Sequence, residues 1–107
     1  MARENVIYLG SELKFNVHIE PIGNVSMSDY DFMVELFTGK SRTVTIKKED
    51  ALFVDKDNYK VKADTETLGI GRVIALVTCL IPDADFDDGV RTEILRIDTG
   101  IDIVKAK

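Results

Sequence analysis

The stretch that decides the fold runs from residue 71 to residue 97. It reads Gly71-Arg72-Val73-Ile74-Ala75-Leu76-Val77-Thr78-Cys79-Leu80-Ile81, then the acidic segment Asp83-Ala84-Asp85-Phe86-Asp87-Asp88-Gly89, then Val90-Arg91-Thr92-Glu93-Ile94-Leu95-Arg96-Ile97. Both outer runs are apolar and rich in β-branched residues, and the segment between them is rich in residues that favour turns. This order predicts a buried β-hairpin and places the protein in the β class.

Working outward, other segments alternate between apolar and polar side chains with a period of two, which is typical of half-buried strands. Residues 13–20, 42–46 and 59–64 show this pattern. Residues 28–37 are ambiguous, because Ser28 and Asp31 resemble the capping box of a helix while the following residues alternate. We predict a strand there. Residues 51–54 fit either a short strand or an irregular apolar plug.

The crossover before the hairpin contains Leu68, which we expect to plug the core, and the glycines Gly69 and Gly71. Two glycines this close indicate positive φ angles or a close approach of backbone. They do not form a phosphate loop, because they precede a strand and a phosphate loop opens a helix. The tail 101–104 is expected to add a last edge strand.

Seven or eight short strands in one domain, residues 1–107, predict an all-β fold: an immunoglobulin-like two-sheet antiparallel β-sandwich. The chain has no Trp, so an antibody-type domain with its Cys…Trp…Cys signature is excluded. We expect the following residues to be largely buried: Leu13, Phe15, Val17, Ile19, Val34, Leu36, Val73, Ala75, Val77 and Cys79.

The charge of the chain restricts its partners. A net charge of −5 argues against nucleic acid, which requires a basic surface. No stretch approaches the ~20 apolar residues of a membrane span, and residues 1–5 lack the apolar segment of a secretion signal. We therefore expect a soluble protein, made in a cytoplasm, with no membrane partner.

Two groups of residues could carry chemistry. A nucleophilic Cys79 would need His18, the only histidine, but the strand pattern places Cys79 in the core and His18 toward solvent. The four carboxylates Asp83, Asp85, Asp87 and Asp88 are weak calcium candidates, since the loop lacks the Gly and Glu positions of an EF-hand. We expect a solvated turn, with Phe86 tucked down as an anchor. The sequence thus predicts no catalytic residues, no cofactor and no enzyme activity.

Three segments carry a family resemblance. They are Asn5-Val6-Ile7-Tyr8-Leu9-Gly10-Ser11-Glu12-Leu13-Lys14-Phe15, the pattern Tyr59…Asp64-Thr65-Glu66-Thr67-Leu68-Gly69-x-Gly71, and Pro82-Asp83-Ala84-Asp85-Phe86-Asp87-Asp88-Gly89-x-Arg91-Thr92-Glu93. Together they resemble small immunoglobulin-like structural proteins of Bacteroidales phages and prophages. The layout is also similar to the N-terminal domain of phage baseplate upper proteins, although those continue into fibrous regions and this chain ends at Lys107.

The resemblance implies a virion structural protein of a tail, baseplate or head-associated assembly, synthesised in the cytoplasm of a bacterial host and located in the virion. Its partners would be other virion proteins, and a homo-oligomer is expected. The alternative is a glycan- or protein-binding sandwich, for which Tyr8, Tyr30 and Tyr59 are the candidate stacking rings. The apolar terminal segments carry little edge protection. They supply our candidate interface residues: Val6, Ile7, Tyr8, Leu9, Ile101, Ile103 and Val104.

Overall fold

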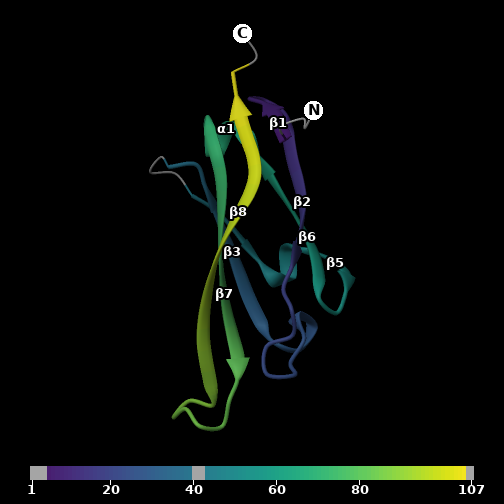
Figure 1. Ribbon diagram of the computed structural model, residues 1–107, viewed down its shortest axis with the longest axis vertical. Coiled ribbons are helices and arrows are strands. Elements are labelled where there is room, and N and C mark those ends of the chain that lie inside the picture. The colour runs from purple at the N-terminus through teal and green to yellow at the C-terminus, as the bar shows by residue number, and fades with distance from the viewer. Residues whose placement is uncertain (1–4, 40–42, 106–107) are drawn as a thin grey trace.

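The computed structural model describes residues 5–39 and 43–105, which form eight strands (Figure 1). The strands are β1 (Asn5–Tyr8), β2 (Glu12–His18), β3 (Asp31–Phe37), β4 (Val44–Lys47), β5 (Leu52–Asp55), β6 (Asn58–Asp64), β7 (Gly71–Pro82) and β8 (Val90–Val104). Within these residues helix is confined to three single turns: η1 (Met27–Asp29), η2 (Lys48–Asp50) and α1 (Thr65–Leu68).

The strands form two sheets that enclose one core. The larger sheet has the order β1-β8-β7-β3-β4 and the smaller sheet the order β2-β6-β5. One sheet thus contains β2, β5 and β6, and the other contains β3, β4, β7 and β8. This is the immunoglobulin arrangement with one extra strand beside β3. The predicted immunoglobulin-like β-sandwich is therefore confirmed. One pair departs from the antiparallel pattern, since β1 runs parallel to β8 and makes the larger sheet mixed.

The β7–β8 hairpin is confirmed, and β8 is longer than predicted. It continues through Gly100, where φ is 76°, to Val104. The Thr99 hydroxyl donates a hydrogen bond to the Val73 carbonyl at 2.8 Å, and the pairing with β7 shifts register nearby. The expectation of a separate edge strand at 101–104 is wrong, because these residues lie inside the sheet between β1 and β7. Because a side chain supplies a hydrogen bond where the regular pairing is interrupted, the strand bends at this point but does not end.

The predicted core is confirmed with one exception. Nine of the ten residues expected inside are buried, and Phe15 is only half-buried. Phe15 lies on β2, an edge strand of the smaller sheet, and borders an open groove between β2 and β8. No further strand covers Phe15 there within the described residues, so its ring keeps part of its surface in water.

The two ambiguous segments are both strands. Residues 31–37 form β3, and the capping contact lies one turn earlier, where the Ser26 amide donates to Asp29 Oδ2 at 3.3 Å in η1. Residues 52–55 form β5, whose side chains are all exposed, so the alternative of an apolar plug is wrong.

The crossover behaves as predicted. Leu68 is fully buried, and Gly69 and Gly71 have φ angles of 89° and 138°. A Cβ atom on Gly71 would lie 2.8 Å from the carbonyl oxygen of Thr38. The Thr38 hydroxyl donates to the Leu68 carbonyl at 2.8 Å, so the two chain segments are tied together at this point. Only glycine fits such an approach.

Candidate functional site

In the acidic loop between β7 and β8, Asp83 and Asp88 accept hydrogen bonds from the loop and from β8, whereas Asp85 and Asp87 are exposed. Asp83 accepts hydrogen bonds from the Asp85 amide and from Arg91, whose Nη1 lies 2.7 Å from Asp83 Oδ2. Asp88 accepts from the Val90 amide at 3.3 Å. No group of three or more His, Cys, Asp or Glu side chains in the described residues is arranged to hold a metal ion. The loop therefore has the geometry of a capped turn.

Phe86 does not anchor this loop. Its side chain is 47% exposed, so the expectation that it tucks down is wrong. The tip of the β7–β8 hairpin extends beyond the smaller sheet (Figure 1), which leaves no second layer for the ring to pack against.

Cys79 and His18 lie in different environments and do not form a pair. Cys79 is fully buried beside Tyr30, and burial raises the pKa of both side chains. His18 is exposed on β2, with Nδ1 3.1 Å from Asn58 Oδ1 and Nε2 3.0 Å from Glu20 Oε2. The hydrogen bond with Glu20 is the main cause that raises the pKa of His18. A thiol with a raised pKa and no adjacent base is a poor nucleophile.

The terminal interface candidates pair with each other. Val6 is paired with Asp102, Ile7 with Ile103 and Tyr8 with Val104. Ile7, Leu9 and Ile101 pack against the core, and Ile103 is fully buried. Val6 and Tyr8 are 45% and 55% exposed on the strand that forms the edge of the larger sheet. Of the seven candidates, these two have the geometry to contact a neighbour across a free edge.

A second apolar edge, which sequence reasoning missed, lies on β5. Leu52, Phe53 and Val54 are 44%, 64% and 47% exposed. Among the strands of the described residues, β5 is the edge of the smaller sheet and has β6 as its one neighbour (Figure 1). The signal in the sequence was three consecutive large apolar residues without alternation, flanked by acidic residues, which is not the pattern of a half-buried strand.

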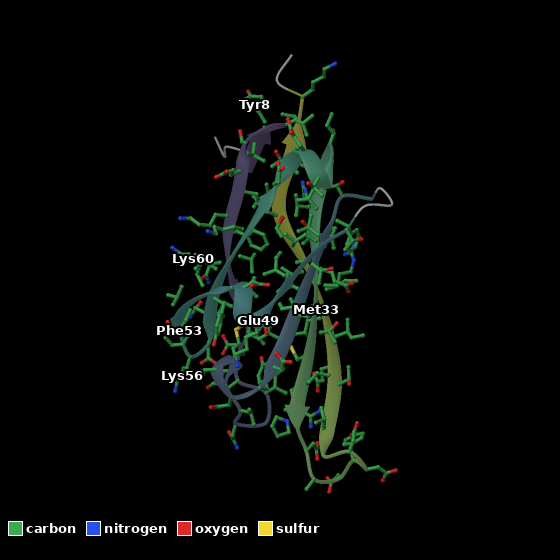
Figure 2. All side chains as sticks on the ribbon, turned by 180° about the vertical axis from the view of Figure 1, so that it is seen from behind. Tyr8, Met33, Glu49, Phe53, Lys56 and Lys60 are labelled. Carbon is green, nitrogen blue, oxygen red and sulfur yellow. The ribbon has the colours of Figure 1, made fainter. Side chains whose placement is uncertain are left out.

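Phe53 is held in place despite its exposure. Its ring meets Tyr59 edge to face, with centroids 5.5 Å apart, and Tyr59 meets Phe32 at 5.0 Å. Such aromatic pairs contribute about 0.5–1.5 kcal/mol each beyond burial. Figure 2 shows Phe53 on the same side of the molecule as Lys56 and Lys60, with Tyr8 at the far end on β1. The two exposed apolar edges are thus separate surfaces.

The side of the sandwich between β2 and β8 is open. A shallow groove of about 410 Å³ runs there between the end of β2 and the middle of β8, lined partly by Ile19, Ile22 and Leu95. It contains His18 and Glu93 but no arrangement of nucleophile, base and orienting group. Tyr30 and Tyr59 are buried, so of the three tyrosines only Tyr8 presents a ring to a ligand.

Comparison with known proteins identifies no family. No protein-family model matches the chain, and no curated protein matches it. Among solved structures it is similar to a proposed glycoside hydrolase from Bacteroides vulgatus ATCC 8482, with a TM-score of 0.49 and 8% identity. The match covers 96% of this chain and 17% of the hydrolase. A similarity at this level carries no information about activity or substrate. No helix in the described residues is long and apolar enough to cross a membrane.

Proposed function

We propose that this chain is a non-enzymatic structural module of a phage or prophage virion, incorporated into a tail, baseplate or head-associated assembly. The observation that carries the proposal is the β5 edge, where three consecutive residues, Leu52, Phe53 and Val54, are exposed on a strand that pairs with β6 on one side and forms the edge of the sheet on the other. An edge strand offers free N–H and C=O groups to another chain, and proteins that stay alone usually protect it with charge or proline. In a module built to join neighbours, such an edge is an attachment point.

The irregular pairing of β5 limits how a neighbour can attach. The register with β6 shifts between Phe53 and Asp55, so regular strand geometry covers only the first residues of β5. A neighbour would therefore gain few backbone hydrogen bonds and more side-chain contact, chiefly with the Phe53 ring. Aromatic anchors of this kind dominate the energetics of many protein interfaces.

The resemblance of the three sequence segments to Bacteroidales phage proteins supports the virion setting. The proposed partners are other virion proteins, and copies of the chain itself.

The setting is tested on particles from the bacterium that encodes the chain. After prophage induction and density-gradient purification, mass spectrometry should detect the chain in the particle fraction at a stoichiometry of several copies. If it is found only in the soluble lysate, the virion role is rejected.

The edge is tested by Phe53→Lys, with Ile70→Lys as the matched control. Ile70 is 44% exposed and lies outside the strands, in the loop before β7. We expect Phe53→Lys to lower incorporation into particles by about tenfold or more, since loss of a central aromatic contact typically costs 2 kcal/mol or more. Ile70→Lys should leave incorporation unchanged. Equal behaviour of the two variants would remove β5 from the attachment surface.

A further inference from the structure

The outward faces of the two sheets differ in character. On β2 and β6 of the smaller sheet the outward side chains are polar and exposed, among them Lys14, Lys62 and Lys60. On the larger sheet, the outward positions of β3, β7 and β8 include Met33, Leu76, Leu80 and Ile94. An antiparallel sheet with one face in water normally shows apolar residues inside and polar residues outside. Strands β2 and β6 obey this pattern, with Leu52 on the edge strand β5 as the exception in the smaller sheet, and the larger sheet does not obey it.

Strand β7 shows the departure most clearly. Its inward residues Val73, Ala75 and Val77 are fully buried, and its outward residues include Ile74, Leu76 and Leu80. A strand that is apolar on both sides is typical of a sheet covered on both faces. Yet Leu80 is 40% exposed and Ile94, on neighbouring β8, is 63% exposed. Ile74, at the other end of the same face, is buried at 8%, so the uncovered part of the face lies around Leu80 and Ile94, where no strand of the described residues packs over it.

We propose that a second copy of the chain covers the outward face of the larger sheet, around a two-fold axis that runs along β7. This inference deepens the proposed function by naming one partner. The pairing register aligns residues of three strands in rows across the face. One row is Glu35, Leu76 and Arg96, and the next is Met33, Thr78 and Ile94. A two-fold axis along β7 places β3 of one copy opposite β8 of the other at the same height.

This symmetry makes the charged row complementary to itself. Glu35 of each copy meets Arg96 of the other, with Leu76 on the axis between the two ion pairs. Neither Glu35 nor Arg96 forms an ion pair with any residue in the described part of the chain. Asp98, two residues after Arg96 on β8, is held by Arg72 at 3.2 Å. The contact would satisfy both free charges in each copy.

The neighbouring row is complementary in polarity. Met33 of each copy meets Ile94 of the other, and Thr78 meets Thr78 on the axis. Sheets packed face to face are rotated by about 30°, which displaces distant rows more than central ones. These two rows lie in the middle of the face, so their alignment survives the rotation.

The contact area between the two copies sets the expected affinity of the dimer. Three strands about 4.8 Å apart, over seven residues of about 3.4 Å, give a contact of roughly 700–1,000 Å² over both copies. Specific stable interfaces begin near 1,000 Å² in total. We therefore expect a weak, concentration-dependent dimer, with a dissociation constant between about 1 μM and 1 mM.

Charge reversal tests the contact on the full chain by sedimentation velocity at low salt. Glu35→Arg alone, or Arg96→Glu alone, places like charges opposite each other in both ion pairs, and each variant should dimerise at least about tenfold more weakly than the wild type. An equimolar mixture of the two variants should form a heterodimer, because both pairs are then of opposite sign. The double variant Glu35→Arg/Arg96→Glu should dimerise like the wild type for the same reason.

Matched controls change the same charge elsewhere. Glu12 and Lys62 lie on the outward face of the smaller sheet. The variants Glu12→Arg and Lys62→Glu should therefore leave dimerisation unchanged. Recovery in the mixture shows that both single variants are folded, since an unfolded variant could not pair.

Three outcomes would overturn the inference: a wild type that stays monomeric up to about 1 mM, a dimer that both single reversals leave intact, or single variants that fail to pair when mixed. None of these concerns incorporation into particles, so the proposed function is tested separately. In particular, a dimer lost on Phe53→Lys but kept on both reversals would place the contact at β5.

Discussion

Gly71→Ala tests the close approach between the start of β7 and the end of β3. Gly71 has a φ angle of 138°, and an added Cβ would lie 2.8 Å from the Thr38 carbonyl oxygen and 3.3 Å from the Thr38 Cβ. Thr38 cannot move away freely, because its hydroxyl donates to the carbonyl of buried Leu68. The substitution therefore combines backbone strain with a steric clash.

The two contributions can be separated with Gly89→Ala. Gly89 has a φ angle of 76° and nothing within 4 Å of an added Cβ, so only the backbone strain applies there. Such strain costs about 1–2 kcal/mol for an L-residue in the left-handed region. At Gly71 a strain of about 1–3 kcal/mol adds to an overpacking cost of about 1–3 kcal/mol. We expect Gly71→Ala to destabilise the fold by about 2–6 kcal/mol, a large part of the stability of a small domain.

Urea unfolding followed by circular dichroism measures the difference. Both variants should lower the midpoint without changing the dependence of free energy on urea, and Gly71→Ala should lower it by at least about twice as much as Gly89→Ala. If the two variants are equally stable, or Gly71→Ala is the more stable, the close approach at Gly71 does not constrain the chain and the reasoning fails.

Two further predictions concern titration and metal binding. The pKa of His18 should lie above its ordinary value of 6.5 in the folded protein, and Glu20→Gln should lower it. Because the pKa is raised on folding, the stabilising contact is complete below the unfolded pKa and is lost as pH rises through the folded one. Proton NMR of this single histidine measures its pKa in the wild type and in Glu20→Gln. A wild-type pKa at or below 6.5 contradicts the assignment. Millimolar calcium should leave the Tm nearly unchanged, because Asp83 and Asp88 already accept backbone and Arg91 hydrogen bonds and no three His, Cys, Asp or Glu side chains of the described residues are arranged to hold a metal ion. Binding at 100-fold above the dissociation constant would add about 2.7 kcal/mol and raise the Tm by roughly 10 °C or more, so a shift of that size in a calorimetric scan would establish a calcium site.

Local patterns in the sequence were sufficient wherever one residue's environment follows from its immediate neighbours. Alternation with a period of two identified the strands around Leu13, Val34 and Val61, and their inward faces are buried as expected. The two glycines of the crossover predicted positive φ angles, because the tolerance of glycine for positive φ is a property of the residue itself. The same locality explains why Cys79 and His18 could be assigned to opposite environments.

Tertiary structure decided every question about edges and outer faces. Whether 101–104 or 52–55 is an edge depends on which strands lie beside them, and strand neighbours are set by packing across the whole chain. Phe15 is more exposed than the pattern predicts because it borders the open groove between β2 and β8, and Phe86 because the hairpin tip extends beyond the smaller sheet. The apolar run of β7 predicted a buried hairpin, but only the register shows that Glu35, Leu76 and Arg96 form one row. A sequence pattern reports what a side chain prefers, whereas the partners that satisfy the preference are chosen by the packing of distant strands and of other chains.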